Sequence, residues 1–274
     1  MNHLAFHLKP QADLEIAWEE LHSCGLQPLY SSEEPGGSRI LYATVPVGLE
    51  VSAFEDQMEW IEAITKADLT IDWEAQWASH GLDYKEGFVH VDPSSYGHVF
   101  LDAVHPPPIK LEAGPGFGDL SHPTTRLMLK MMANRMTGQY VVDVGCGSGV
   151  LSLCAVGMGA KSAYGVDIDP EAILHSRSNA KLNGFEKQII FGLPGSLPNL
   201  SRKKPLTILM NMIWSEQTAA WQALPKLHKL SGEILTSGIL EQDRDCYLAI
   251  CKNWGLSLIQ QQEEEGWLGF RFKL

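Results

Sequence analysis

The sequence lacks the features that mark membrane, secreted and zinc-binding proteins. No apolar run approaches the roughly 18 residues that a membrane-spanning helix requires. Residues 1–15 have no basic start followed by an apolar stretch, so we expect no signal peptide. The five cysteines are scattered and form no Cys-x-x-Cys pair, which predicts reduced thiols and no metal site. Together these absences predict a cytoplasmic protein.

Positive charge is also scarce. The chain has 21 basic and 33 acidic residues, a formal net charge of −12, and an acidic protein repels phosphate backbones. The richest basic stretch covers only residues 202–204, which we interpret as a solvated loop. We therefore expect no direct contact with nucleic acid, and we predict a monomer whose partner is a small molecule or a basic protein.

Residues 1–70 alternate short strand-like and helix-like patterns. The order is β-α-β-β-α-β, which is typical of a small ferredoxin-like α+β unit. We expect strands over 4–10, 26–32, 39–46 and 67–73, and helices over 12–25 and 51–65. Residues 71–110, which include Trp73 and Trp77, are predicted to form a linker with short strands that pack on the second domain.

Strands separated by helices occupy residues 111–274, and this alternation is typical of a parallel sheet. The expected strands cover 139–145, 162–169, 188–194, 206–213 and 232–240. The expected helices cover 149–159, 170–184, 215–230 and 241–255, followed by an antiparallel hairpin over 256–262 and 267–274. The sequence thus predicts an α/β, Rossmann-like domain behind the small α+β unit.

The strongest motif is Val141-Val-Asp-Val-Gly-Cys-Gly-Ser-Gly149. A buried strand here ends in a glycine-rich turn, where the missing Cβ atoms of Gly145, Gly147 and Gly149 let the backbone turn sharply and approach a ligand. The alternative is a tight turn that binds nothing. Asp143 argues against this alternative. An unpaired carboxylate inside an apolar strand would be costly, so its presence indicates a partner such as a bound ligand.

A second acidic motif, Gly165-Val-Asp-Ile-Asp-Pro170, supports a ligand site. Asp167 lies 22 residues beyond Gly145, at the end of the next strand, where Rossmann-type sheets bind ribose hydroxyls. Asp169 followed by Pro170 fits a helix N-cap.

A nicotinamide dinucleotide is the rival ligand. Its sites usually show Gly-x-Gly-x-x-Gly and hold pyrophosphate at the helix N-terminus. The spacing here is Gly-x-Gly-x-Gly, and an acidic residue stands two positions before the first glycine. An anionic side chain suits the sulfonium and ammonium groups of S-adenosylmethionine better than it suits pyrophosphate. The motif therefore favours a methyltransferase.

The chain resembles the PrmA family, which methylates large-subunit ribosomal protein eleven. The resemblance extends from about residue 110 to the C-terminus. It rests on Phe117-Gly-Asp-Leu-Ser-His-Pro-Thr-Thr125, residues 141–151, residues 165–173 with 178–184, and Leu235-Thr-Ser-Gly-Ile-Leu240. It implies a class I methyltransferase domain, a ferredoxin-like N-terminal domain that recognises the ribosomal protein, and S-adenosylmethionine as cofactor.

The resemblance also assigns site residues. Thr125, Gly145, Asp167 and Asn211 fall where the family contacts the cofactor, and Asn211 falls beside the transferable methyl group, where its carbonyl would accept from the incoming amine. Thr125 could instead cap a helix, and Asn211 could instead satisfy loop backbone. His122 is either a ligand-facing or a structural histidine.

Two departures from the family lie near the expected substrate entrance. The usual Gly-Thr-Gly-Thr-His is Gly118-Asp-Leu-Ser-His122 here, and the usual Asn-Ile-Leu-Ala is Asn211-Met-Ile-Trp214. Trp214 either narrows an acceptor channel or packs in the core. The resemblance implies N-methylation of amino groups of a ribosomal protein. The alternatives are a methyltransferase acting on another protein or a small molecule, and a degenerate homologue that binds the cofactor without catalysis.

Overall fold

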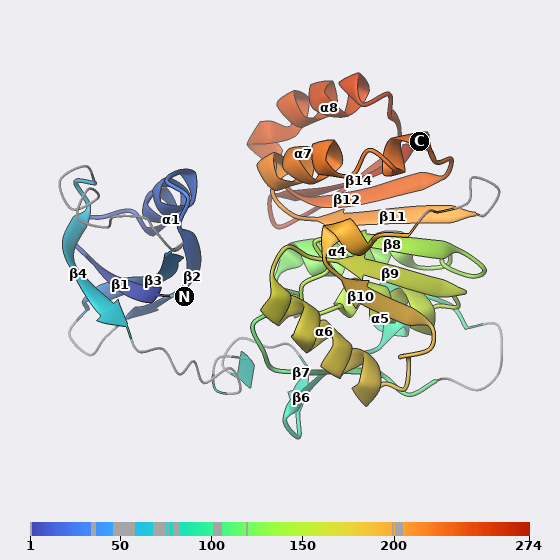
Figure 1. Cartoon of the computed structure of the whole chain (residues 1–274), viewed down its shortest axis with the longest axis horizontal. Helices are drawn as coiled ribbons and strands as arrows, with labels where there is room; N and C mark the ends of the chain where they lie inside the picture. The colour runs from blue at the N-terminus through green and yellow to red at the C-terminus, as the bar shows by residue number, and fades with distance from the viewer. Residues whose placement is uncertain are drawn as a thin grey trace. The chain divides into compact units, whose positions relative to one another are not determined.

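A computed structural model describes residues 2–33, 37–45, 58–67, 75, 77–78, 83–100, 106–118, 120–198, 200 and 205–274. The chain divides into two compact units, residues 1–71 and 72–274 (Figure 1). No helix in these described ranges is long and apolar enough to cross a membrane. Four predicted features lie outside the described residues: the first part of the helix expected over 51–65, residues 68–73 of the strand expected over 67–73, Trp73, and the basic stretch 202–204.

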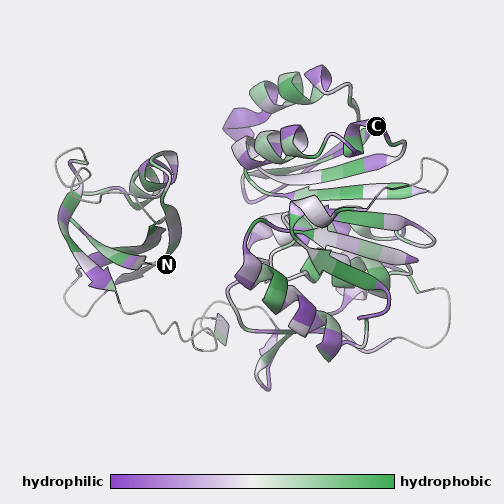
Figure 2. Cartoon of the chain, in the orientation of Figure 1, coloured by the Kyte–Doolittle hydropathy of each residue, from purple (hydrophilic) through white to green (hydrophobic). Residues whose placement is uncertain are grey.

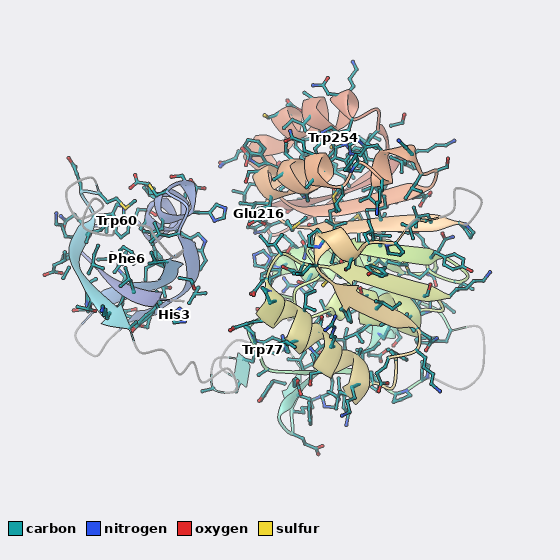
Figure 3. All side chains as sticks on the ribbon, viewed as in Figure 1. His3, Phe6, Trp60, Trp77, Glu216 and Trp254 are labelled. Carbon is teal, nitrogen blue, oxygen red and sulfur yellow. The ribbon has the colours of Figure 1, made fainter. Side chains whose placement is uncertain are left out.

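The N-terminal unit is a four-stranded antiparallel sheet with the strand order β2-β3-β1-β4. Its described elements are β1 (Asn2–Leu8), α1 (Leu14–Ser23), β2 (Gln27–Glu33), β3 (Arg39–Val45) and β4 (Ile61–Ala67). Alternate residues of β1, such as Leu4 and Phe6, share one core with Ala17 and Leu21 of α1. The Phe6 and Trp60 rings lie 6.2 Å apart in this core (Figure 3). This strand order is that of the expected ferredoxin-like sheet.

The last strand of this unit begins earlier than predicted. The sequence pattern favoured a helix up to residue 65 and a strand over 67–73, but β4 occupies Ile61–Ala67. Ile61 pairs with Leu8 and Ile64 pairs with Phe6, and all four side chains contact the same core. Packing across the sheet therefore outweighs the helix-like spacing of these apolar residues.

The larger unit is built on a seven-stranded sheet with the order β10-β9-β8-β11-β12-β14-β13 (Figure 1). Its strands are β8 (Tyr140–Val144), β9 (Ser162–Val166), β10 (Ile189–Gly192), β11 (Leu206–Asn211), β12 (Glu233–Leu240), β13 (Ser257–Glu264) and β14 (Trp267–Lys273). The first five are parallel, and β13 and β14 form an antiparallel hairpin. The predicted parallel sheet and hairpin are confirmed.

Helices cover both faces of this sheet because its strands are apolar on both faces. Val141 and Leu209 share a core with α4 (Pro123–Met132), α5 (Val150–Gly157) and α6 (Pro170–Leu182). Their neighbours Val142 and Ile208 share a second core with α7 (Trp214–Ala223) and α8 (Arg244–Asn253). Figure 2 shows hydrophobic stretches along the central strands, whereas α6 alternates between hydrophobic and hydrophilic residues. The architecture is a Rossmann-like α/β sandwich.

One predicted helix is shorter than expected. The pattern over 215–230 indicated a single helix, but α7 ends at Ala223 and only a 3-10 turn, Leu227–Lys229, follows. Pro225 explains the break, because proline lacks an N–H group and disfavours helical backbone at the residue before it.

The described part of the predicted linker packs as part of the larger unit. It contains a three-stranded sheet of β5 (Tyr84–Lys85), β6 (Phe88–Val91) and β7 (Ile109–Glu112), in that order. Val89 and Val91 of β6, with Leu111 of β7, are fully buried in the core that also contains α4 and α5. This small sheet therefore supports the helices that face the candidate site.

Candidate functional site

The candidate site lies at the carboxyl edge of the parallel strands. Val144, the last residue of β8, is paired with Val166 and with Met210. Gly145, Asp167 and Asn211 come directly after these three residues, so the structure brings them to one edge of the sheet. Ligands of open α/β sheets bind outside this edge.

The N-terminus of α4 reaches the same edge. His122, just before α4, has its ring 5.0 Å from that of Trp267, and Trp267 is paired with Leu240 at the end of β12. Thr125, in the first turn of α4, therefore lies near the carboxyl edge as well.

The glycine-rich turn adopts backbone conformations that require glycine. Gly145, Gly147 and Gly149 have φ angles of 71°, 52° and 82°, in the left-handed region that other residues rarely adopt. A Cβ on Gly147 would also overlap the carbonyl oxygen of Phe117. The turn therefore depends on both the backbone freedom and the small size of these residues.

The N–H groups of this turn are already bound within the protein. Gly145 donates to the carbonyl oxygen of Val166 at 2.8 Å, and Gly147 donates to Oδ2 of Asp167 at 2.9 Å. Ser148 N–H donates to the carbonyl oxygen of Phe117 at 2.8 Å. The pyrophosphate of a dinucleotide is bound by free backbone N–H groups in such a turn. The geometry thus argues against a nicotinamide cofactor.

Asp143 supports α5 from inside the sheet. Its Oδ2 accepts from the N–H of Ser152 at 3.0 Å and from the hydroxyl of Ser152 at 2.8 Å. Gly149, the N-cap of α5, has no side chain to bind this N–H. Asp143 is 1 % exposed, and this burial raises its pKa to about 7. Its Oδ1 has no partner among the described residues, and its expected cofactor contact stays a prediction.

The carboxylates that follow β9 have different partners. Asp167 is half-buried, its Oδ2 accepts from Gly147, and its Oδ1 accepts from the N–H of Asp169 at 3.0 Å. Burial raises the pKa of Asp167. Asp169 accepts from the N–H of Glu171 at 2.9 Å, with Pro170 as the first residue of α6, so the predicted N-cap is confirmed. Each Asp167 oxygen has a second lone pair, and its ribose contact stays a prediction.

Thr125 and Asn211 carry buried oxygens that have no partner among the described residues. These are Oγ1 of Thr125, which is fully buried, and Oδ1 of Asn211, which is 9 % exposed. Thr125 does not cap α4, because the ring of His122 accepts from the N–H of Thr124 instead. Buried polar atoms without partners are rare in proteins. A bound polar ligand at this edge would satisfy them.

The loop after Asn211 is fixed by a buried polar network that sequence reasoning missed. Nε2 of Gln217 donates to the carbonyl oxygens of Met212 at 2.7 Å and Ser237 at 2.9 Å. The hydroxyl of Tyr247 donates to Oε1 of Gln217 at 2.6 Å. Since Gln217 and Tyr247 lie on α7 and α8, both helices hold the backbone beside Asn211.

The segment that departs from the family at Gly118–His122 is held by Arg126 of α4. The Arg126 guanidinium donates to the carbonyl oxygens of Leu120 at 3.0 Å and Ser121 at 2.7 Å. It also pairs with Glu264 of β13 at 2.9 Å. The C-terminal hairpin therefore helps to position this segment, a contact between residues too distant in sequence for a motif to reveal.

Trp214 is not a core residue. It is the first residue of α7 and is 38 % exposed, and the adjacent Ile213 is 40 % exposed. The interpretation of Trp214 as a buried packing residue is therefore wrong. Trp214 follows Asn211 by three residues, so it lies just beyond the carboxyl end of β11.

Replacement of Trp214 tests this placement. We expect Trp214→Ala to lower the free energy of unfolding by less than about 1 kcal/mol, because surface substitutions have small effects. Trp221 on the same helix is 4 % exposed, so Trp221→Ala provides a matched control that should cost roughly 3–5 kcal/mol. Thermal and urea melts of both variants measure the difference. Equal losses in the two variants would show that Trp214 is buried.

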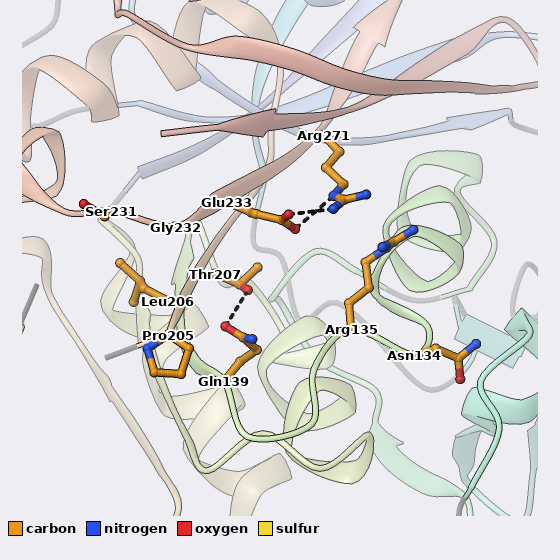
Figure 4. Close-up of a pocket in the computed structure, with 10 residues that line it drawn as sticks. All are labelled: Asn134, Arg135, Gln139, Pro205, Leu206, Thr207, Ser231, Gly232, Glu233 and Arg271. Carbon is orange, nitrogen blue, oxygen red and sulfur yellow. Dashed lines mark hydrogen bonds and ion pairs between the residues drawn. The ribbon is translucent and has the colours of Figure 1, made fainter. Parts of the chain in front are cut away.

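A cavity of about 400 Å³ lies at the opposite edge of the sheet (Figure 4). Thr207 near the start of β11 and Glu233 at the start of β12 line it. Arg271 donates to both carboxylate oxygens of Glu233, at 2.6 and 2.9 Å. This cavity is at the amino ends of the strands and is separate from the site of Asp167 and Asn211.

The family model "Ribosomal protein L11 methyltransferase (PrmA)" matches residues 50–274. The chain belongs to the PrmA family. A curated PrmA relative from Thiobacillus denitrificans, named "Ribosomal protein L11 methyltransferase", is 37 % identical over 161 residues, which cover 58 % of this chain and 52 % of the relative. A relative of the same name from Histophilus somni is 32 % identical over 213 residues, which cover 74 % of this chain and 67 % of the relative.

A solved structure has the same fold as this PrmA member. It is a "ribosomal protein L11 methylase" from Lactobacillus delbrueckii subsp. bulgaricus, with a TM-score of 0.53 and 23 % identity. The likeness covers 65 % of this chain and 91 % of that chain. The chain spans about half the length of the first curated relatives it matches. The family resemblance and the Rossmann-like fold predicted from sequence are confirmed.

Proposed function

We propose that this chain is an S-adenosylmethionine-dependent methyltransferase that methylates amino groups of a ribosomal protein. Its membership of the PrmA family and the names of its curated relatives support this activity. We propose further that it acts as a cytoplasmic monomer without direct contact with nucleic acid. The observation that carries the proposal is Oδ1 of Asn211, a buried oxygen with no partner among the described residues, next to Gly145 and Asp167 at the sheet edge.

The residues present at this edge fit the cofactor. Gly145 and Gly147 allow close approach of the backbone, and Asp167 has lone pairs for ribose hydroxyls. The partnerless oxygens of Thr125 and Asp143 would accept hydrogen bonds from polar groups of the bound molecule. When bound, S-adenosylmethionine supplies a methyl group that is already activated, so the site needs no strong acid.

Asn211 would orient the acceptor. Its carbonyl accepts a hydrogen bond from the incoming amine, which aims the nitrogen lone pair at the methyl group. A lysine acceptor, with a reference pKa of about 10.4, must lose its proton before it can react. The nearly complete burial of Asn211 favours loss of this proton, because a site that keeps water away from the amine disfavours its charged form. Residues 1–70 would bind the body of the protein substrate, as the family resemblance implies.

Methyl transfer to a complete proteome tests the proposal. The 274-residue chain is incubated with methyl-labelled S-adenosylmethionine and a lysate of cells that lack it, and Asn211→Ala serves as the matched control. We expect one labelled band at a small ribosomal protein and a much weaker band with the variant. Label on other proteins or on small molecules only would identify a different acceptor. Cofactor binding without any label would support a degenerate homologue.

A further inference from the structure

One face of α6 carries polar side chains that bind the backbone of β7. His175 and Asn179 of α6, and Asn183, the C-cap residue directly after it, are spaced four residues apart and therefore share a face of the helix. Asn183 accepts from the N–H of Lys110 at 2.9 Å and donates to its carbonyl oxygen at 2.7 Å. Asn179 accepts from the N–H of Glu112 at 2.9 Å. The side chains of α6 thus bind β7 as a neighbouring strand would.

His175 extends this contact toward the candidate site. Its Nδ1 accepts from the N–H of Gly116 at 3.1 Å, and its Nε2 donates to the carbonyl oxygen of Glu112 at 2.8 Å. Only the neutral ring protonated at Nε2 makes both bonds. The ring is 6 % exposed, and burial lowers its pKa, which favours the neutral form. Trp77 packs edge-on against it, with 5.9 Å between ring centroids.

The backbone that His175 holds is in direct contact with the glycine-rich turn. Ser148, between Gly147 and Gly149, is fully buried. Its N–H donates to the carbonyl oxygen of Phe117, and its hydroxyl donates to that of Gly118 at 3.1 Å. Its own carbonyl oxygen accepts from Nδ2 of Asn179 at 2.9 Å. Residues 116–118 and α6 therefore fix Ser148 from several sides.

We propose that His175 is a positioning residue for cofactor binding, which acts by holding Gly116 so that residues 116–118 keep the glycine-rich turn in its binding conformation. Without the Nδ1 acceptor, the buried N–H of Gly116 loses its partner, which is costly. The segment then shifts, Ser148 loses its contacts, and the binding-competent turn is less populated. The inference rests on the proposed function, because the turn is taken to bind S-adenosylmethionine.

Two isosteric variants separate the two bonds of His175. In His175→Asn the amide oxygen takes the place of Nδ1, which keeps the acceptor for Gly116 but loses the donor to Glu112. In His175→Gln the amide nitrogen takes the place of Nε2, which keeps the donor to Glu112 but loses the acceptor for Gly116. Each variant loses one hydrogen bond, so their melting temperatures should fall by similar amounts.

Calorimetry with S-adenosylmethionine provides the decisive readout. We expect His175→Gln to weaken binding about tenfold, as the loss of one buried hydrogen bond would. His175→Asn should bind within about twofold of the wild type, and turnover at saturating cofactor should change little in either variant. If His175→Gln does not fold, His175→Leu replaces it, because leucine also lacks the acceptor for Gly116 and should show the same loss of affinity.

The inference is overturned if both histidine variants bind like the wild type, or if both lose affinity equally. In the first case His175 contributes only to stability, and in the second its effect on affinity does not come from the bond to Gly116. A wild-type protein that binds no S-adenosylmethionine would instead refute the proposed function, and this inference with it, before any variant is compared.

Discussion

Asp143→Asn should remove a pH dependence of stability on the order of 3–4 kcal/mol between pH 4 and pH 8. Burial raises the folded-state pKa of Asp143 from 3.8 to about 7. Because the pKa of Asp143 is higher in the folded than in the unfolded protein, protonation of this carboxyl stabilises the folded state, and the stabilisation is fully present below about pH 4. It is lost as pH rises through 7, where the buried group becomes charged. Asparagine keeps an oxygen for Ser152 and carries no charge at any pH.

Urea unfolding of the cofactor-free protein across this pH range measures the effect. As pH rises, the free energy of unfolding of the wild type should fall relative to that of Asp143→Asn, so the variant becomes increasingly the more stable of the two. Asp143→Ala is the matched control, because it also lacks the charge but cannot bind Ser152. It should therefore be less stable than Asp143→Asn by an amount that does not change with pH. A constant gap between Asp143→Asn and the wild type would contradict the prediction.

Asp167→Ala should weaken S-adenosylmethionine binding ten- to a hundredfold or more. A hydrogen bond to a charged group contributes roughly 1.5–3 kcal/mol, and the carboxylate is expected to bind two ribose hydroxyls. The structure adds a second cause, because Asp167 also holds the N–H of Gly147 in the glycine-rich turn. Both losses act on the same binding surface.

Asp169→Ala is the control for Asp167→Ala, since this carboxylate caps α6 two residues further along. Loss of the cap should cost about 0.5–2 kcal/mol of stability and leave cofactor affinity unchanged. Calorimetry on both variants, after their folding is verified, gives the comparison. A folded Asp167→Ala protein that binds like the wild type would exclude Asp167 from the ribose site.

The sequence predicted the parts of the site that depend on local rules. Gly145 and Gly147 occupy backbone conformations that few other residues adopt, and Asp169 before Pro170 caps a helix, so both features are visible in a short stretch of chain. The place of Asp167 and Asn211 follows from parallel strands ending at one edge. These predictions did not require knowledge of the tertiary packing of the helices.

The supporting contacts depend on tertiary packing and were not predicted. His175 binds Gly116, which is 59 residues away, and nothing local to either residue indicates the other. The four-residue spacing of His175, Asn179 and Asn183 places them on one side of α6 and its C-cap, where they form a polar stripe, but the spacing does not indicate the strand that they bind. The prediction of a helix up to residue 65 was wrong for the same reason. Ile61 and Ile64 belong to β4 because they pair with Leu8 and Phe6 across the sheet, and the local helical spacing does not show this pairing.

The polar stripe on α6 also bears on how β7 behaves toward other molecules. β7 is an edge strand of its three-stranded sheet, and exposed edge strands can pair with strands of other chains and lead to aggregation. The N–H and carbonyl groups of Lys110 and Glu112 that face away from β6 are bound by α6 side chains. The same side chains that support the candidate site thus close this edge to strand addition.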